Sequence, residues 1–227
     1  MPREIPKYKR WLSYLTEQVL ETASSEYNEY LAVSLVHGRL QLVAEDAIYS
    51  FGDYYLNFRK VFERFNFGLL PERARVLVLG LGLGSIPELL ERHLYLRYDY
   101  VAVEIDPVII ELASDYSLPL LAANIEVVQA DALAFLQFDE RQYDLICVDV
   151  FQDADVPEHL LTDAFLHLLR DSLAPQGALI YNRLADTTEH QRQAATFYEK
   201  RFLPIFPGGT VVNTGGNHML INEARFV

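Results

Sequence analysis

From residue 75 onward, short apolar runs alternate with segments of helical spacing, a pattern typical of a parallel sheet covered by helices on both faces. The runs are almost continuously apolar, as expected for strands buried on both sides. The last two runs flank Gly215 and Gly216 and predict an antiparallel hairpin. The predicted strands are 76–79, 100–103, 125–128, 145–148, 178–181, 210–213 and 218–222, and the predicted helices are 86–96, 108–113, 132–136, 160–173 and 188–202.

The first 74 residues follow a different pattern, in which short β-type runs and aromatic residues at helical spacing replace the regular alternation. The predicted elements are a helix over 11–21, a hairpin over 30–36 and 40–43, and a helix over 51–67. We therefore expect an N-terminal helix and β-hairpin extension over 1–74 and an α/β domain over 75–227.

The composition narrows the class of protein. The chain has 227 residues, of which 51% are hydrophobic and 22% charged, and this balance excludes intrinsic disorder for most of the chain. The net charge of −13 makes general binding to nucleic-acid backbones unfavourable, so we expect no nucleic acid as partner. The acidic excess suits a cationic partner, although in most acidic proteins it serves solubility alone.

The cysteine and histidine content excludes several kinds of site. Cys147 is the single cysteine and lies in an apolar run, so we expect a buried inert thiol and neither a disulfide nor a cysteine zinc site. No pair of histidines has metal-ligand spacing, and we predict no metal. The first residues lack a signal-peptide pattern and no apolar stretch reaches about 18 residues, so we expect a cytoplasmic protein without a membrane span.

A glycine turn follows the first predicted strand of the α/β part. Gly80, Gly82 and Gly84 have the spacing G-x-G-x-G, whereas a dinucleotide site favours G-x-G-x-x-G. Glu104 ends the next strand, 24 residues beyond Gly80. A carboxylate there can accept hydrogen bonds from both hydroxyls of a ribose. Either feature alone also fits an ordinary turn or a solvated strand end, but together they favour a nucleoside ligand.

Two further acidic residues follow predicted strands. Asp131, just before Ala132, either accepts a hydrogen bond from an adenine amino group or caps the helix that begins there. Asp149 lies where the reacting group of a bound nucleoside is expected. Its carboxylate can hold a cationic sulfonium or amine, or accept a proton, unless it is merely a solvated strand end.

Several segments of the chain match the motifs of one known family. They are residues 76–85, 103–107, 129–132, 143–149, 156–165 and 173–177. On these segments the chain resembles the S-adenosylmethionine-dependent methyltransferases, and within them the spermidine synthase branch, over about residues 27–222. The resemblance implies a Rossmann-like methyltransferase fold with a mostly parallel seven-stranded sheet, and S-adenosylmethionine or its decarboxylated form as cofactor.

The resemblance also assigns roles to residues. It implies that Gly80, Gly82 and Gly84 border the methionine end of the ligand and that Glu104 binds the ribose. Asp131, with Ala132 beside it, is then placed at the adenine. It further implies a small-molecule acceptor, and Tyr49 and Tyr55 can line its pocket, although aromatic residues at such positions more often belong to the core or to a dimer interface. We expect a homodimer that involves the aromatic N-terminal region.

Two departures from the family pattern bear on the reaction. Leu83 stands where spermidine synthases carry an Asp that helps to hold the aminopropyl amine, and Gln152 stands where their second loop Asp activates the attacking amine. A neutral amide cannot accept that proton, although Asp153 or Asp155 can substitute if the loop shifts. With Asp149 and Asp153 as catalytic candidates, the sequence favours methyl transfer. Aminopropyl transfer and a non-catalytic relative that keeps the fold are the alternatives.

Overall fold

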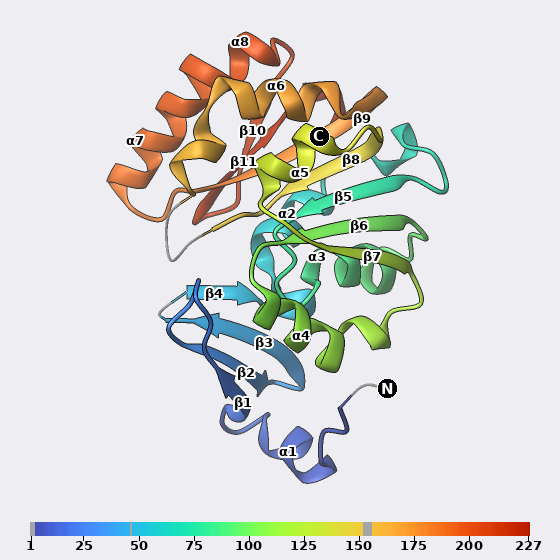
Figure 1. Ribbon diagram of the computed structural model, residues 1–227, viewed down its shortest axis with the longest axis vertical. Helices are drawn as coiled ribbons and strands as arrows, with labels where there is room; N and C mark the ends of the chain where they lie inside the picture. Colours follow the sequence, from blue (N-terminus) through green and yellow to red (C-terminus); the bar gives the residue numbers. More distant parts are fainter. Residues whose placement is uncertain (1–2, 46, 152–155) are drawn as a thin grey trace.

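The computed structural model describes residues 3–45, 47–151 and 156–227 (Figure 1). Its strands form a four-stranded sheet and a seven-stranded sheet. The strands of the first sheet are β1 (Gln18–Ala23), β2 (Leu31–Val36), β3 (Arg39–Ala44) and β4 (Ala47–Ser50). Those of the second are β5 (Arg75–Leu79), β6 (Asp99–Glu104), β7 (Asn124–Gln129), β8 (Tyr143–Val148), β9 (Leu173–Leu184), β10 (Thr210–Asn213) and β11 (Asn217–Ile221).

The seven-stranded sheet confirms the predicted fold class. Its strand order is β10-β11-β9-β8-β5-β6-β7, and β11 alone runs antiparallel to its neighbours. Within this sheet β5 comes first along the chain. β6 and β7 follow on one side of it, and β8 then lies on its other side. In open sheets of this kind, ligands bind beyond the carboxyl ends of the strands where the order reverses. Leu79 lies opposite both Val103 and Val148, so the residues that follow β5, β6 and β8 meet at one edge.

Helices cover both faces of this sheet because its strands are apolar on both sides. The helices are α1 (Lys7–Leu12), α2 (Leu56–Phe62), α3 (Ser85–Glu88), α4 (Pro107–Tyr116), α5 (Ala132–Phe138), α6 (Asp163–Asp171), α7 (Thr188–Phe197) and α8 (Leu203–Ile205). Val76 and Val78 share a core cluster with α2, α3 and α4, whereas Leu77 and Leu79 share a second cluster with α5, α6 and α7. In the part of the chain that the structure describes, no helix has the length and apolar character needed to cross a bilayer.

The N-terminal region differs from the sequence prediction. The helix expected over 11–21 is wrong: α1 ends at Leu12, and Gln18–Ala23 forms β1, which pairs antiparallel with β2. The apolar positions that suggested a longer helix, Trp11 and Leu15, are 67% and 70% exposed, so a longer helix would not bury them in a core. Pairing with β2 satisfies the backbone instead. These exposed side chains are the surface on which the homodimer prediction depends.

The predicted boundary between residues 74 and 75 separates the two sheets along the chain but not two hydrophobic cores. Leu31 and Leu42 of the small sheet belong to the same core cluster as Val76 and Val78 of β5. The helix expected over 51–67 is shorter, since α2 occupies only Leu56–Phe62. The buried side chains of α2 belong to the same core cluster, and along the chain α2 lies between the strands of the two sheets.

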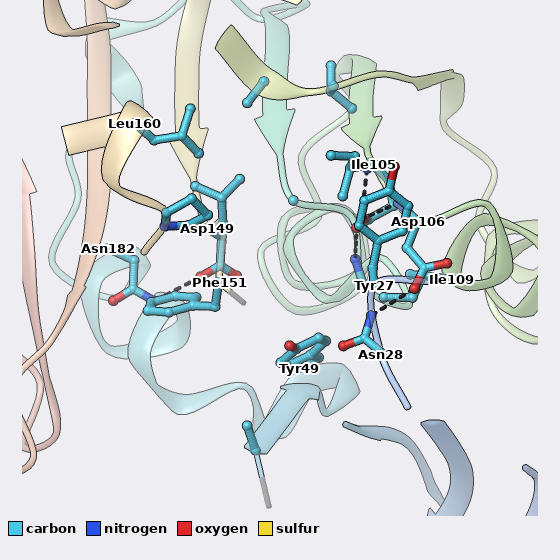
Figure 2. A pocket seen from close by; sticks show the side chains of 18 of the residues that line it. Tyr27, Asn28, Tyr49, Ile105, Asp106, Ile109, Asp149, Phe151, Leu160 and Asn182 are labelled. Atoms are coloured by element: carbon cyan, nitrogen blue, oxygen red, sulfur yellow. Dashed lines mark hydrogen bonds between the residues drawn. The ribbon is translucent and has the colours of Figure 1, made fainter. Parts of the chain in front are cut away.

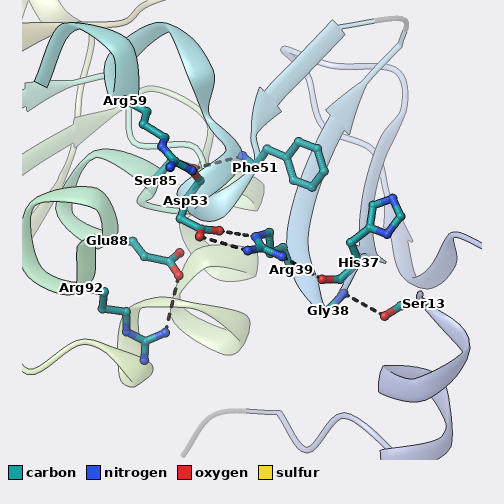
Figure 3. Close-up of polar contacts among 10 residues, drawn as sticks. All are labelled: Ser13, His37, Gly38, Arg39, Phe51, Asp53, Arg59, Ser85, Glu88 and Arg92. Atoms are coloured by element: carbon teal, nitrogen blue, oxygen red, sulfur yellow. Dashed lines mark hydrogen bonds and ion pairs between the residues drawn. The ribbon is translucent and has the colours of Figure 1, made fainter. Parts of the chain in front are cut away.

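Polar contacts also join the end of the small sheet to the start of α3. The hydroxyls of Ser50 and Ser85 lie 2.6 Å apart. The backbone amide of Phe51 donates to the Ser85 hydroxyl at 3.0 Å (Figure 3). Beside them, Arg39 of β3 forms an ion pair with Asp53. The small sheet is therefore fixed against the start of α3, directly after the glycine turn.

Candidate functional site

A cavity of about 730 Å³ lies at the carboxyl ends of the parallel strands. Residues that follow β5, β6, β7, β8 and β9 line one side, and Tyr27, Asn28 and Tyr49 of the N-terminal region line the other. Figure 2 shows Asp149, Phe151 and Asn182 facing Tyr27 and Asp106 across it. Its volume suits a ligand the size of a nucleoside together with a small second substrate.

The glycine turn forms the floor of this cavity through close backbone approaches. Gly80 has φ +91°, and a Cβ there would lie 2.2 Å from the backbone oxygen of Asp149. Gly82 has φ +51°, and its Cβ would lie 3.1 Å from the backbone oxygen of Tyr49. Both glycines line the cavity, and their contact with a ligand stays a prediction. Glycine at these two positions thus also allows close backbone contact with the residue after β8 and with β4 of the N-terminal sheet.

Gly84 and Leu83 lie elsewhere. Gly84 is outside the described cavity lining, precedes α3 with φ +78°, and faces Leu118 of a neighbouring turn. The expectation that Gly84 borders the ligand therefore does not match its position: its left-handed backbone begins the helix. Leu83 is 3% exposed and belongs to the core cluster, not to the lining. It does not fill the cavity.

Glu104 lines the cavity and is fixed by backbone amides. Its Oε2 accepts hydrogen bonds from the amides of Leu81 and Gly82 at 3.1 and 3.4 Å, and its Oε1 from those of Ile105 and Asp106 at 2.9 and 3.1 Å. Burial raises the pKa of Glu104, and these amides oppose the shift. The glycine turn and Glu104, which the sequence combined into one hypothesis, are hydrogen-bonded to each other.

Asp106 ties the N-terminal region to this part of the site. Its Oδ1 caps α4 by accepting from the amide of Val108 at 2.9 Å. Its Oδ2 accepts from the Ser25 hydroxyl at 2.5 Å and from Asn28 Nδ2 at 2.7 Å. This carboxylate therefore holds the loop that carries Tyr27 and Asn28 beside Glu104. Neither lining residue could be predicted from sequence, because nothing in residues 24–30 indicates that Asn28 contacts Asp106, 78 residues further along the chain.

Asp131 has the capping role that the sequence kept as an alternative. Its Oδ1 accepts from the Ala134 amide at 2.9 Å at the start of α5, and its Oδ2 contacts His159 Nε2 at 2.7 Å. Burial works to raise the pKa of Asp131, but the amide and His159 outweigh it and lower the pKa. Asp131 and Ala132 both line the cavity. An adenine amino group would therefore share Oδ2 with His159, a partner that the sequence did not identify.

Asp149 is the carboxylate nearest the strand-order reversal. Its Oδ1 accepts from Asn182 Nδ2 at 2.8 Å, and the Tyr55 hydroxyl is a second donor that lowers the pKa of this carboxyl. Burial raises its pKa to about 6, while these two donors and the nearby Glu104 charge contribute smaller effects. A carboxyl whose pKa lies this close to neutrality, within a cavity, is a candidate for proton transfer.

The tyrosines and the second catalytic candidate complete the list of predicted site residues. Tyr49 and Tyr55 both line the cavity. Tyr55 is also part of the core, stacked on Phe58 with ring centroids 6.1 Å apart, so the two roles weighed for it coexist. Asp153 lies outside the described residues, as do Gln152 and Asp155.

The charge of the cavity lining is one-sided. Among the described lining residues there is neither lysine nor arginine. The acidic lining residues are Glu104, Asp106, Asp131, Asp149, Glu158 and Asp186. Such a cavity suits ligands that carry positive charge. Over residues 3–45, 47–151 and 156–227, no cluster of three or more His, Cys, Asp or Glu side chains is arranged to hold a metal ion.

Comparisons with known proteins agree with this architecture. The family model described as "Spermine/spermidine synthase domain" matches residues 64–213. The polyamine aminopropyltransferase of Vibrio vulnificus is 33% identical over 135 residues, which cover 57% of this chain and 45% of that protein. The N-terminal histidine N-methyltransferase of Emericella nidulans is 35% identical over 119 residues, covering 50% of this chain and 20% of that protein.

Among solved structures, a probable spermidine synthase from Corynebacterium glutamicum superimposes with a TM-score of 0.72 at 18% identity, covering 88% of this chain and 78% of that one. At this identity the likeness concerns the fold. The curated aminopropyltransferase matches span about half the length of those proteins or less.

Proposed function

This chain belongs to the spermine/spermidine synthase domain family, and from that premise we propose that it transfers an aminopropyl group from decarboxylated S-adenosylmethionine to an amine of a small polyamine. The sequence favoured methyl transfer because of Leu83 and Gln152. The family match and the aminopropyltransferase relatives support the other reading better. Leu83 is also weaker evidence against aminopropyl transfer than the sequence suggested, because its side chain lies in the core and not in the cavity lining.

The observation that carries this proposal is the acidic cavity without lysine or arginine in its described lining. Decarboxylated S-adenosylmethionine carries a sulfonium and an ammonium, and a polyamine acceptor carries further ammonium groups. S-adenosylmethionine differs by an added carboxylate, for which the described lining offers no cationic partner except His159. Charge complementarity therefore favours the decarboxylated donor.

The residues at the ends of β6 and β7 suit the nucleoside part of the donor. Glu104 would accept from the ribose hydroxyls, and its four backbone amides keep the carboxylate in place for them. Asp131 would face the adenine amino group, which it would share with His159. The open cavity over Gly82 and Asp149, which neither Leu83 nor Phe151 blocks, supports an enzyme over a non-catalytic scaffold.

The proposed reaction is a displacement at carbon. The lone pair of the acceptor amine forms a bond to the aminopropyl carbon attached to sulfur, the carbon–sulfur bond breaks, and methylthioadenosine leaves as a neutral thioether. The amine must first lose a proton, and in this proposal Asp149 accepts it. The remaining contribution of the chain is to hold donor and acceptor in line in a cavity of limited size.

The direct test is product analysis by mass spectrometry. The purified protein is incubated with putrescine and either decarboxylated or unmodified S-adenosylmethionine. We expect methylthioadenosine and spermidine from the decarboxylated donor, and no methylated amine from the other. Methylated putrescine with S-adenosylhomocysteine would support methyl transfer instead. No product from either donor, together with no binding of either in a calorimetric titration, would favour the non-catalytic relative.

Replacing Glu104 by Gln tests the ribose contact. The amide keeps one acceptor oxygen but turns N–H groups toward donors, so we expect the KM for the donor to rise by about ten- to a hundredfold with a smaller change in kcat. Steady-state kinetics with saturating acceptor measures it. Glu111→Gln, on the exposed side of α4, is the matched control. An unchanged donor KM in Glu104→Gln would remove Glu104 from the donor site.

A further inference from the structure

We propose that Asn217 and Asn182 form a positioning relay that orients the Asp149 carboxylate as the proton acceptor, an inference that rests on the proposed function. Both asparagines line the cavity. Neither would touch the transferred group in this role. They would act through Asp149.

The hydrogen bonds of the relay have a direction. Asn217 Nδ2 donates to Asn182 Oδ1 at 2.9 Å, and Asn182 Nδ2 donates to Asp149 Oδ1 at 2.8 Å. Figure 2 shows the Asn182 amide beside Asp149. An amide has a donor end and an acceptor end. Because Asn217 occupies the acceptor end of Asn182, the donor end faces Asp149. An N–H donor at this position stabilises the ionised carboxylate more than the protonated acid.

Asn217 is itself fixed by the terminal hairpin. It begins β11 opposite Leu184 of β9, and its carbonyl accepts from both the amide and the hydroxyl of Thr214, at 3.0 and 3.1 Å. The Thr214 carbonyl in turn accepts from Lys60 Nζ of α2. The relay is thus held by the terminal hairpin and, through Thr214, by α2. Asn182 is 1% exposed and has little room to move.

The groups around Asp149 give the relay its importance. The Tyr55 hydroxyl also lowers the pKa of this carboxyl. The charge of Glu104 works against ionisation of Asp149. The buried thiol of Cys147 lies two residues earlier, in β8, and Asp186 adds a further carboxylate to the lining. Without Asn217, the Asn182 amide can turn its oxygen toward Asp149, an arrangement that favours the protonated acid.

The hairpin supplies its own control. Asn213, Asn217 and Asn222 all belong to the terminal hairpin or directly follow it, but they have different partners. Asn213 accepts from the Gly215 amide in the exposed turn, and Asn222 is buried between Gly177 and Leu179. Among these three, Asn217 alone reaches the described cavity lining. Asn213→Leu therefore changes the same hairpin without touching the relay.

The experiment titrates the Asp149 carboxyl by carbon-13 NMR in labelled protein without substrate, with the resonance assigned from its absence in Asp149→Asn. Asn217→Leu is expected to raise the pKa of Asp149 by about one unit, the effect of one lost hydrogen bond to a charge. Asn213→Leu should leave it unchanged. Should Asn217→Leu melt too low for the titration, Asn217→Ala gives the same test. An unchanged Asp149 pKa in a folded Asn217 variant overturns the relay.

The kinetic arm separates this proposal from the proposed function. If both hold, the acid limb of kcat moves to higher pH in Asn217→Leu by the same amount as the NMR titration, while the KM for the donor stays constant. A shifted titration in a protein that forms no aminopropyl product would keep the relay and reject the proposed reaction. Active enzyme with an unshifted titration would do the reverse.

Discussion

Replacing Asp149 by Asn is expected to lower kcat for aminopropyl transfer by about a thousandfold while the donor still binds. The amide keeps the shape and one acceptor oxygen but cannot take the proton of the attacking amine, and a positioned base is worth about 10²- to 10⁴-fold. In the unmodified enzyme, kcat should fall below about pH 6, because the Asp149 pKa is raised to about 6 by burial. Steady-state kinetics at saturating acceptor, with calorimetric titration of the donor, measures both.

The same substitution is expected to stabilise the fold. The pKa of Asp149 is about 6 in the folded chain against an ordinary value of 3.8, so the folded state binds the proton more tightly than the unfolded state. Ionised Asp149 therefore destabilises the folded state above pH 6, and this destabilisation decreases as the pH falls from about 6 to 3.8. At pH 8 Asp149→Asn should gain about 2 kcal/mol, visible as a higher melting temperature, and less at pH 5.

A surface control separates these effects from a general change of charge. Asp171→Asn removes a carboxylate that is 63% exposed, and it should alter neither kcat nor the melting temperature appreciably. If Asp149→Asn keeps most of its kcat, Asp149 is not the base. Loss of activity in Asp153→Asn alone would then assign the proton to that residue.

Gly80→Ala should have the largest effect on stability of the glycine substitutions in the turn. An L residue is strained at φ +91°, and the new Cβ would lie 2.2 Å from the Asp149 carbonyl oxygen, a backbone atom that cannot turn aside. We expect the free energy of unfolding to fall by about 3 kcal/mol or more, together with loss of activity as the end of β8 moves. Urea unfolding at pH 7.5 measures the first effect.

Gly216→Ala is the matched control for this substitution. Its Cβ would meet nothing within 4 Å, and its backbone does not have the positive φ of Gly80. We expect a change of less than about 1 kcal/mol, of either sign. Equal destabilisation by the two alanines would mean that the close approach of β5 and β8 is not what selects glycine at position 80.

Most of the seven-stranded sheet could be predicted from sequence, because a buried parallel strand is marked by its own run of apolar residues. The acidic residues after those runs then identify one edge of the sheet, where Glu104, Asp131 and Asp149 indeed lie together. Asn182 and Asn217 could not be found in this way. They are 35 residues apart, and only the antiparallel pairing of β11 with β9 brings them together.

The failures have physical causes of the same kind. The residues of β1 show helical spacing, but an available partner strand outweighed that local preference. Gly80 and Gly84 belong to the same sequence motif, but Gly80 packs against the backbone after β8, whereas Gly84 precedes α3. Leu83 suggested a missing cavity group, whereas the direction of its side chain, which no spacing rule reveals, places it in the core.

The core shared by the two sheets has a consequence for how the chain unfolds. Because Leu31 and Leu42 share one cluster with Val76 and Val78, and because Asp106 holds Asn28, neither sheet can melt while the other keeps its packing. Loss of structure is then a single cooperative event, without a half-folded intermediate. A ligand held in the cavity between the two regions would accordingly slow the opening of the entire chain, and protection of backbone amides from hydrogen exchange would rise far from the binding site as well as beside it.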